Sequence, residues 1–162
     1  MAEVFILLGG NVGDKHEIFT ETRKMIGDCI GKSTKLSSIY DTEPWGFESE
    51  PFWNQVLVIE TMLLPFEILN LTQAIETKMG RVRSSGYYES RPMDIDLLFY
   101  DDLILNTPRL TLPHPKIAER RFVLEPLNEI APLKHHSVTG YTISEMLRMC
   151  NDHLRVEKND QK

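Results

Sequence analysis

Short apolar runs along the chain predict the strands of a sheet. Residues 4–8 form a buried strand pattern closed by two glycines, and residues 52–61 carry apolar side chains on both faces of an extended chain. Residues 94–100 give the strongest strand pattern in the sequence, and residues 35–40 give a further one. We expect residues 109–112 to extend the same sheet.

Apolar residues at helical spacing predict two helices between these strands. The first follows Asp14, which forms a capping box with Glu17, and ends at Gly31. The second begins with Pro65, a favoured first helical residue, and ends at Gly80. Strands and helices therefore alternate in the order βαββαβ.

The C-terminal part is expected to be mainly helical. Residues 116–130 and 142–149 have helical patterns, and residues 155–162 are expected to fray. The order βαββαβ predicts a ferredoxin-like α+β sandwich, in which helices pack on one face of a mostly antiparallel sheet and extra C-terminal helices follow. At 162 residues the chain has the length of one domain. We therefore expect a single domain over residues 1–154 and a frayed tail after it.

Composition argues against several classes of protein. The chain has 18 Lys and Arg against 24 Asp and Glu, and this net charge of −6 disfavours a nucleic-acid-binding surface over the whole protein. No apolar run approaches the ~20 residues that span a bilayer, and residues 1–20 lack the pattern of a secretory signal. Cys29 and Cys150 have no CxxC or Cys/His neighbours, which indicates reduced thiols. We expect a cytoplasmic protein without a membrane partner.

The charge balance reverses locally beside a pair of acids. Residues 78–91 carry four basic side chains and one acidic side chain. Asp94 and Asp96 follow directly, and on a strand they point to the same face with Cα atoms about 7 Å apart. Two such carboxylates repel each other unless they share a cation, and oxygen ligands favour a hard ion such as Mg²⁺. Carboxylate-held Mg²⁺ next to arginines is the usual means of neutralising a phosphoryl group in transfer. The alternative is a solvated basic face beside an exposed strand edge.

Further phosphate donors follow this strand. Arg109 and Thr111 share one face of an extended segment, and His114 lies between two prolines. His114 is also compatible with a plain loop position. The turn at residues 8–13 matches neither a GxGxxG fingerprint nor a P-loop, so we interpret it mainly as a turn whose backbone can line a pocket.

Aromatic residues gather in residues 42–54, a segment with two prolines and no periodicity in its first part. With Phe122, this segment can form a slot for a flat heterocycle, whose edges Asn54 or backbone amides would recognise. The alternative places these aromatic side chains in the hydrophobic core. For Trp53 we adopt that alternative.

Seven short motifs follow one another through most of the chain. They are Asn-Val-Gly-Asp at 11–14, Thr-Glu-Pro-Trp-Gly at 42–46, Phe-Trp-Asn at 52–54, Gly-Arg-Val-Arg at 80–83, Arg-Pro-Met-Asp-Ile-Asp-Leu-Leu at 91–98, Leu-Pro-His-Pro at 112–115 and Arg-Arg-Phe-Val-Leu-Glu-Pro-Leu at 120–127. Together and in this order, they resemble the 6-hydroxymethyl-7,8-dihydropterin pyrophosphokinases of the folate pathway. The resemblance runs from about residue 4 to residue 132.

This resemblance implies a reaction and a set of site residues. The family transfers the β,γ-pyrophosphoryl group of ATP to the hydroxymethyl oxygen of the pterin, releases AMP and uses two Mg²⁺ ions. By resemblance, Asp94 and Asp96 are the metal ligands, and Arg81 and Arg91 are catalytic arginines that a mobile loop brings to the triphosphate. The positions that match the ATP side are Gln73, Glu76, Arg83, Ile95, Arg109, Thr111, His114 and Arg120. The positions that match the pterin pocket are Thr42, Pro44, Trp45, Phe52, Asn54 and Phe122.

Two other functions fit parts of the same pattern. An RNA-binding module of the RRM type shares the βαββαβ order, but an RNP1-like run is absent from the sequence and the net charge is negative. A Mg²⁺-dependent nucleotide hydrolase would use the same acid pair. Under the favoured interpretation the partners are small-molecule substrates, without nucleic acid, and the protein is a monomer.

Overall fold

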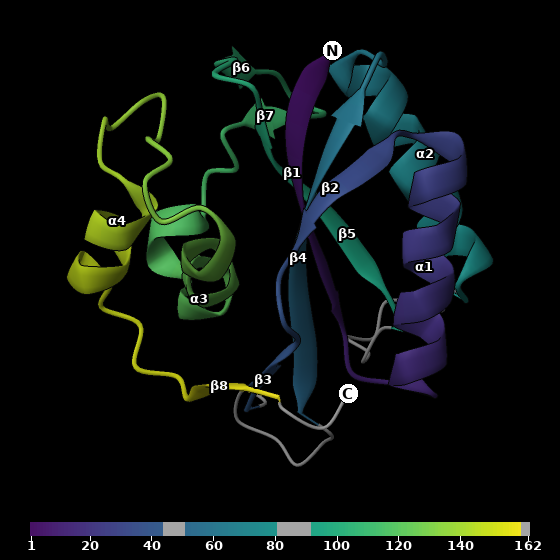
Figure 1. Cartoon of the computed structure of the whole chain (residues 1–162), viewed down its shortest axis with the longest axis horizontal. Helices are drawn as coiled ribbons and strands as arrows, with labels where there is room; N and C mark the ends of the chain where they lie inside the picture. Colours follow the sequence, from purple (N-terminus) through teal and green to yellow (C-terminus); the bar gives the residue numbers. More distant parts are fainter. Residues whose placement is uncertain (44–50, 81–91, 160–162) are drawn as a thin grey trace.

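The computed structural model describes residues 1–43, 51–80 and 92–159, which build a six-stranded antiparallel sheet flanked by helices (Figure 1). The strand order is β5-β1-β4-β3-β8, β2 also pairs with β4, and β6 and β7 form a separate pair. The strands are Ala2–Gly10 (β1), Lys32–Leu36 (β2), Tyr40–Thr42 (β3), Phe52–Thr61 (β4), Asp94–Tyr100 (β5), Leu105–Asn106 (β6), Thr111–Leu112 (β7) and Val156–Lys158 (β8). The helices are Lys15–Cys29 (α1), Pro65–Lys78 (α2), Arg121–Ile130 (α3) and Ile143–Met149 (α4), and a 3₁₀ turn, Ile117–Glu119, precedes α3. With β1 between β5 and β4, this order confirms the predicted ferredoxin-like α+β class.

Helices cover the main sheet on both faces, whereas the sequence predicted helices on one face. Val4, Ile6 and Leu8 of β1 pack in a core with α1 and α2, and Phe5 and Leu7 pack in a second core with α3 and α4. Figure 1 shows the two helix pairs on opposite sides of the strands. Because both faces of β1 are buried, its sequence is a continuous apolar run without polar alternation.

Several sequence predictions agree with the structure. β4 and β5 span the predicted residues, and Asp14 caps α1 by accepting a hydrogen bond from the Glu17 N–H at 3.1 Å. Gly80 follows α2 with a φ of +98°, a conformation that glycine adopts without strain. Cys29 and Cys150 are both free thiols. Among the described residues, no helix has the length and apolar character that a membrane span requires.

The predicted strand over residues 35–40 is wrong, because β2 ends at Leu36 and β3 begins at Tyr40. Between the two strands, the Ser37 hydroxyl accepts a hydrogen bond from the Val56 N–H at 3.0 Å. A side-chain oxygen thus takes a donor of β4 at the point where the strand is interrupted. Serine and threonine hydroxyls commonly compete with the backbone hydrogen bonds of a strand in this way. The apolar pattern of the sequence does not reveal this competition.

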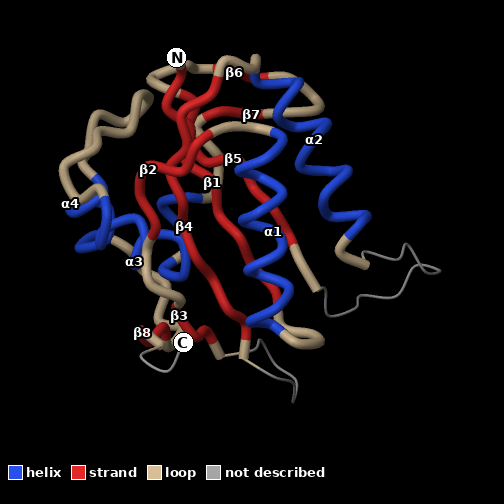
Figure 2. The backbone as a smooth tube through the Cα atoms, turned by 45° about the vertical axis from the view of Figure 1, so that its right-hand side comes forward, coloured by secondary structure: helices blue, strands red, loops and turns tan. Residues whose placement is uncertain are grey.

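Residues 109–112 do not extend the main sheet, which corrects a second prediction. β7 pairs with β6 in a small separate sheet that lies near the N-terminal end of β1 in Figure 2. The reason is a local turn, in which the Leu110 N–H donates to the Thr107 hydroxyl at 3.0 Å and the Thr107 N–H donates to the Leu110 carbonyl at 3.0 Å. This turn folds the segment back on its own preceding residues.

The C-terminal region differs from the prediction at two places. The predicted helix over residues 116–130 is divided, because Arg120 has an extended backbone (φ −127°, ψ 109°) between the 3₁₀ turn and α3. The tail that was expected to fray, residues 155–162, contains β8, and the Asn159 N–H donates to the Ile39 carbonyl at 2.7 Å. β8 pairs with the open edge of β3, and such an edge can order a segment without apolar periodicity.

Candidate active site

One pocket of about 340 Å³ lies at the end of the main sheet where β1 ends and β4 begins. Its walls come from β1, β3, β4, β5, the start of α3 and the segment before β8. Leu7 of this pocket also packs in the core beneath α3, so the pocket lies on the α3 side of the sheet. The residues that line it are Leu7, Gly9, Thr42, Glu43, Phe52, Asn54, Asp94, Asp96, Arg120, Phe122 and Leu154.

Thr42 and Asn54 form a buried polar pair in this pocket. Asn54 Nδ2 donates a hydrogen bond to Thr42 Oγ1 at 3.1 Å, and each residue is 4% exposed. Gly9 lies opposite Asn54 in the β1–β4 register, and a Cβ atom at Gly9 would lie only 3.0 Å from Asn54 Oδ1. Because glycine has no Cβ atom, the Asn54 amide can occupy its position in the pocket.

Asp94 and Asp96 line the pocket from β5, two residues apart on one face of the strand. Across the ladder they pair with residues of β1 that also line the pocket. From α2, on the other side of the sheet, the buried Glu76 accepts a hydrogen bond from the Ile95 N–H at 2.7 Å. This bond fixes the backbone of β5 between the two acids.

The chemistry of this acid pair fits a hard divalent cation. Within residues 1–43, 51–80 and 92–159, no group of three or more His, Cys, Asp or Glu side chains is arranged to hold a metal ion. Mg²⁺ does not require such a cage, because it keeps several waters and takes one or two carboxylates together with substrate phosphates. Two carboxylates in an open pocket match that requirement.

His114 lies within electrostatic range of Asp96. Burial lowers its pKa below the ordinary value, the charge of Asp96 opposes this change, and the cations Arg120 and Lys116 lower the pKa further. His114 Nδ1 accepts a hydrogen bond from the Lys116 N–H at 3.1 Å, which requires that Nδ1 carry no proton. The ring proton is therefore on Nε2, where it can be donated.

Most other positions assigned to ATP by the sequence lie on α2 or in elements that pack against it, outside this pocket. Arg109 Nη2 donates to Asn70 Oδ1 of α2 at 2.7 Å, and its guanidinium lies 5.6 Å from the ring centroid of Phe66. The described positions that do not line the pocket are Gln73, Glu76, Ile95, Arg109 and Thr111, together with His114, which lies in the loop after β7. The predicted nucleotide residues are thus divided between the pocket and the α2 side of the sheet.

Seven of the predicted site residues do come together in the pocket, from both the pterin group and the phosphate group. They are Thr42, Phe52, Asn54, Asp94, Asp96, Arg120 and Phe122. The predicted residues that lie outside the described part of the chain are Pro44, Trp45, Arg81, Arg83 and Arg91. Trp53 packs against the core on the α1 side, its ring 5.7 Å from that of Phe19, which confirms its assignment to the core.

Comparison with known proteins decides the family. A family model described as 7,8-dihydro-6-hydroxymethylpterin-pyrophosphokinase (HPPK) matches residues 5–132. The chain belongs to the HPPK family. It is 43% identical over 139 residues to the 2-amino-4-hydroxy-6-hydroxymethyldihydropteridine pyrophosphokinase of Porphyromonas gingivalis, covering 83% of this chain and 95% of that protein. It is 40% identical over 128 residues to the enzyme of the same name from Bacillus subtilis, covering 78% of this chain and 76% of that protein.

Solved structures show the same HPPK fold. The crystal structure of wild-type Plasmodium falciparum HPPK-DHPS with pteroate superposes with a TM-score of 0.74 at 16% identity. The match covers 91% of this chain and 42% of that chain, so this protein spans less than half of the longer one. By family, the protein is a pyrophosphokinase, a diphosphotransferase, whose step belongs to folate biosynthesis.

The pocket of this HPPK chain includes four residues that the sequence did not single out: Leu7, Gly9, Glu43 and Leu154. Gly9 had a signal, because it lies in the strand-to-glycine turn whose backbone was expected to line a pocket. Glu43 lies within the motif at 42–46. Leu154 had none, because its segment lacks periodicity and lies beyond the residues that match the HPPK model.

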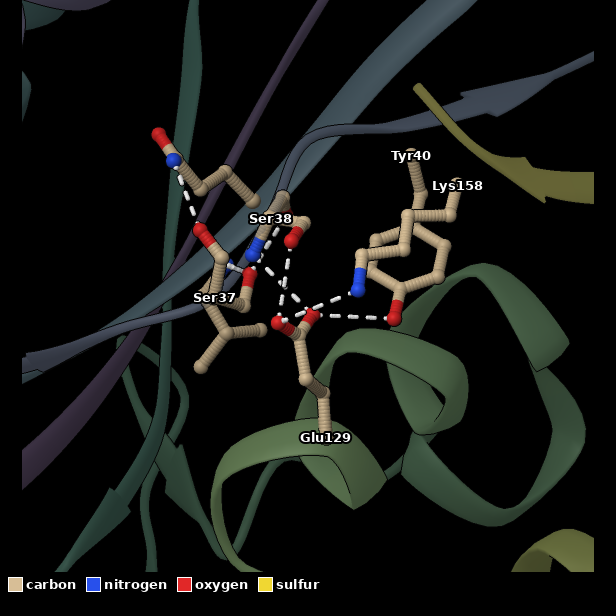
Figure 3. A network of polar contacts seen from close by, with 7 residues as sticks. Ser37, Ser38, Tyr40, Glu129 and Lys158 are labelled. Carbon is tan, nitrogen blue, oxygen red and sulfur yellow. Dashed lines mark hydrogen bonds and ion pairs between the residues drawn. The ribbon is translucent and has the colours of Figure 1, made fainter. Parts of the chain in front are cut away.

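A polar network holds two walls of the HPPK pocket together (Figure 3). Glu129 of α3 accepts hydrogen bonds from the Ser38 N–H (3.0 Å), the Ser38 hydroxyl (2.9 Å) and the Tyr40 hydroxyl (2.9 Å). Lys158 of β8 lies 3.9 Å from the same carboxylate. Burial favours the neutral acid, but these hydrogen bonds and the Lys158 charge outweigh it, so the pKa of Glu129 is below its ordinary value. Burial and the Glu129 carboxylate raise the pKa of Tyr40. The network ties α3 to β3 and β8.

Proposed function

We propose that this pocket binds 6-hydroxymethyl-7,8-dihydropterin, and that the protein transfers the β,γ-pyrophosphoryl group of ATP to its hydroxymethyl oxygen and releases AMP. One observation carries the proposal: two aromatic side chains, Phe52 and Phe122, line the same pocket as a pair of acids, Asp94 and Asp96. The relatives from Porphyromonas gingivalis and Bacillus subtilis are named as pyrophosphokinases of this pterin. The proposal therefore joins the pterin and the transferred group in one place.

The pterin would lie between Phe52 and Phe122, because aromatic faces stack on flat heterocycles. Thr42 and Asn54 would recognise its polar edge. The hydrogen bond between them fixes the orientation of the Asn54 amide. This amide has an NH₂ group that donates hydrogen bonds and a carbonyl oxygen that accepts them. We also assign Pro44 and Trp45 to this slot, in keeping with their positions in the motif at 42–46.

Asp94 and Asp96 would hold the two Mg²⁺ ions of the reaction. When bound, these ions neutralise the charge of the triphosphate and of the group in transfer. The contribution of the chain is positional, since β5 presents both carboxylates on one face and the Glu76–Ile95 hydrogen bond fixes the strand between them.

ATP would extend from the acid pair toward α2. His114 offers its Nε2–H as a donor, and Arg120 places a positive charge at the pocket wall. We assign Arg81 and Arg91 to the triphosphate as the catalytic arginines. The remaining contacts with the nucleotide are assigned to Gln73, Glu76, Arg83, Ile95, Arg109 and Thr111.

Catalysis on this arrangement rests on alignment and on charge. Phosphoryl transfer requires an oxygen in line with the phosphorus and neutralisation of the developing charge, with little covalent work for the protein. The pterin slot orients the hydroxymethyl group toward the acid pair, and the arginines add positive charge. We assign no side chain of the described pocket as the base that takes the hydroxyl proton.

The proposed reaction is tested by its nucleotide product. The purified protein is incubated with ATP, Mg²⁺ and the hydroxymethylpterin, and the nucleotides are separated by chromatography. We expect AMP and the pterin diphosphate in equal amounts, and no AMP with 6-methyl-7,8-dihydropterin, which lacks the accepting hydroxyl. Release of AMP or ADP without the hydroxymethylpterin would instead indicate the nucleotide hydrolase and contradict the proposal.

We further propose that the protein acts as a monomer, in the cytoplasm, on small molecules alone, with residues 1–154 as one catalytic domain. The net charge of −6 supports the absence of a nucleic-acid partner. Parallel titrations with single-stranded RNA and with an ATP analogue plus Mg²⁺ test this point, since only the second is expected to saturate. Sedimentation in the presence of both substrates tests the monomer.

A further inference from the structure

The segment that connects α4 to β8 lies beyond the residues that match the family model, which end at residue 132, yet it forms a wall of the substrate pocket. Leu154 lines this pocket together with Phe122 and Asn54. We propose that Leu154 contacts the pterin as part of its binding slot, and that Asp152 is the residue that positions it. This inference rests on the proposed function, because it takes the pterin as the occupant of the pocket.

Asp152 connects this segment to the start of α3 through both of its carboxylate oxygens. Oδ2 accepts a hydrogen bond from the Arg121 N–H at 3.0 Å, and Oδ1 accepts one from the Leu154 N–H at 3.0 Å. The Arg121 side chain returns the contact, since its Nε donates to the Asp152 carbonyl at 3.1 Å. Arg121 stands between Arg120 and Phe122, which both line the pocket. One carboxylate therefore links the backbone of the α3 wall to the backbone of Leu154.

The other side of Leu154 is fixed to the β3 wall. The Arg155 N–H donates to Glu43 Oε1 at 3.2 Å, and the Glu43 N–H donates to the Arg155 carbonyl at 3.3 Å. β8 then continues along β3, pairing Val156 with Thr42. Leu154 is thus held between two anchored residues.

Neighbouring residues of this segment divide between two cavities. His153 lines a second cavity of about 820 Å³ and does not line the substrate pocket, whereas Leu154 lines both. Arg120 and Phe122 also border both cavities, and their side chains stack, with 5.6 Å from the guanidinium carbon to the ring centroid. Leu154 and Phe122 therefore both lie between the two cavities. An apolar side chain at this point suits the face of a flat ring and excludes water from it.

The experiment measures pterin binding by titration calorimetry, with 6-hydroxymethyl-7,8-dihydropterin added to protein that holds Mg²⁺ and α,β-methylene-ATP. Leu154→Ala is expected to raise the Kd of the pterin about 3- to 10-fold, because the apolar contact is lost. Leu154→Met keeps the volume and is expected to restore near-wild-type affinity. Asp152→Ala is expected to act in the same direction as Leu154→Ala. The matched control is His153→Ala, which is expected to leave the Kd unchanged.

The affinity for α,β-methylene-ATP is measured for each variant and is expected to stay the same. A loss of both affinities in Leu154→Ala would show a general structural role and overturn the inference. If Leu154→Ala binds the pterin like the wild type while Asn54→Ala binds it weakly, the pocket assignment stands and the role of Leu154 is overturned. If Asn54→Ala and Phe122→Ala also bind the pterin normally, the proposed function of the pocket fails, and the inference fails with it.

Discussion

Single residues contribute to the pocket either by the charge of their side chain or, at Gly9, by the absence of a side chain. Asp94 and Asp96 share one face of β5, and the charge of Asp96 also opposes the burial effect on the pKa of His114. Two carboxylates attract a divalent cation more strongly than a carboxylate and a neutral amide do. We therefore expect the reaction to depend on each acid separately.

Asp96→Asn is expected to lower kcat by about 100-fold or more, because the amide keeps the size of the side chain and loses its charge. The variant is assayed at saturating ATP and pterin over a range of Mg²⁺ concentrations. Asp102→Asn is the control, since Asp102 is an exposed acid whose side chain is 89% accessible. A kcat close to that of the wild type at saturating Mg²⁺ would refute the assignment of Asp96 as a metal ligand.

Gly9→Ala is expected to weaken pterin binding roughly 10-fold while the protein stays folded. The added Cβ atom would lie 3.0 Å from Asn54 Oδ1, so the amide must shift by a few tenths of an ångström from its position beside Thr42. The measurement is the Kd of the pterin in the presence of an ATP analogue. Gly27→Ala is the matched control, because a Cβ atom at Gly27 meets nothing within 4 Å. Equal pterin affinities in the two variants would show that Gly9 is not needed for the pocket.

The residues of the pocket differ in how far the sequence could reveal them. Asp94 and Asp96 were predictable, because alternation along a strand places residues two apart on one face. Phe122 and Asn54 were suggested by the aromatic segment at residues 42–54, and the resemblance to the family added Thr42. Leu154 was not predictable by either route, because its place depends on Asp152, which accepts a long-range hydrogen bond from the Arg121 N–H and a local one from the Leu154 N–H.

At the scale of secondary-structure elements, Glu129 determines how β3 meets α3. It accepts three hydrogen bonds from Ser38 and Tyr40, and it lies near Lys158 of β8. Because the pKa of Glu129 is below its ordinary value of 4.5, the folded state favours the charged form. The network therefore stabilises the folded protein above pH 4.5, and this contribution is lost as the pH falls below 4.5 through the folded-state pKa.

Glu129→Gln is expected to lower the free energy of unfolding by about 1 kcal/mol at neutral pH. The difference from the wild type is expected to shrink as the pH falls below 4.5, since protonated Glu129 is also neutral. Urea unfolding at a series of pH values measures both effects. Glu119→Gln serves as the control, because Glu119 forms an exposed pair with Lys116. A loss of stability that is the same at every pH would contradict this role of the Glu129 charge.

The elements divide into those with a local pattern and those without one. β4 and β5 were predictable to the residue, because both are long and buried among apolar neighbours. β2 has five exposed residues, and β8 is a three-residue edge strand, so neither has an apolar pattern. Their positions follow from pairing with β4 and β3, which are contacts that no short stretch of sequence encodes.

At the scale of the whole molecule, the sheet separates two cores and carries the pocket at one end. One core contains α1 and α2, and the other contains α3 and α4. The pocket needs the second core, because α3 supplies Phe122 and packs against the strands through Val123, Leu124 and Leu127. The double burial of β1 was visible in the sequence as an unbroken apolar run, but the identity of the second covering layer was not.

Leu7 and Leu154 line the same pocket, although they come from opposite ends of the chain. A ligand in the pocket therefore binds only the folded protein and stabilises the fold as a whole. At a concentration 100 times its Kd, a ligand adds about 2.7 kcal/mol by mass action. For a domain of this size the Tm is expected to rise roughly 5 to 10 °C in one cooperative transition. Differential scanning calorimetry measures this rise, and an early melting step insensitive to the pterin would contradict it. The Tm therefore reports pterin binding even in variants that have lost catalytic activity.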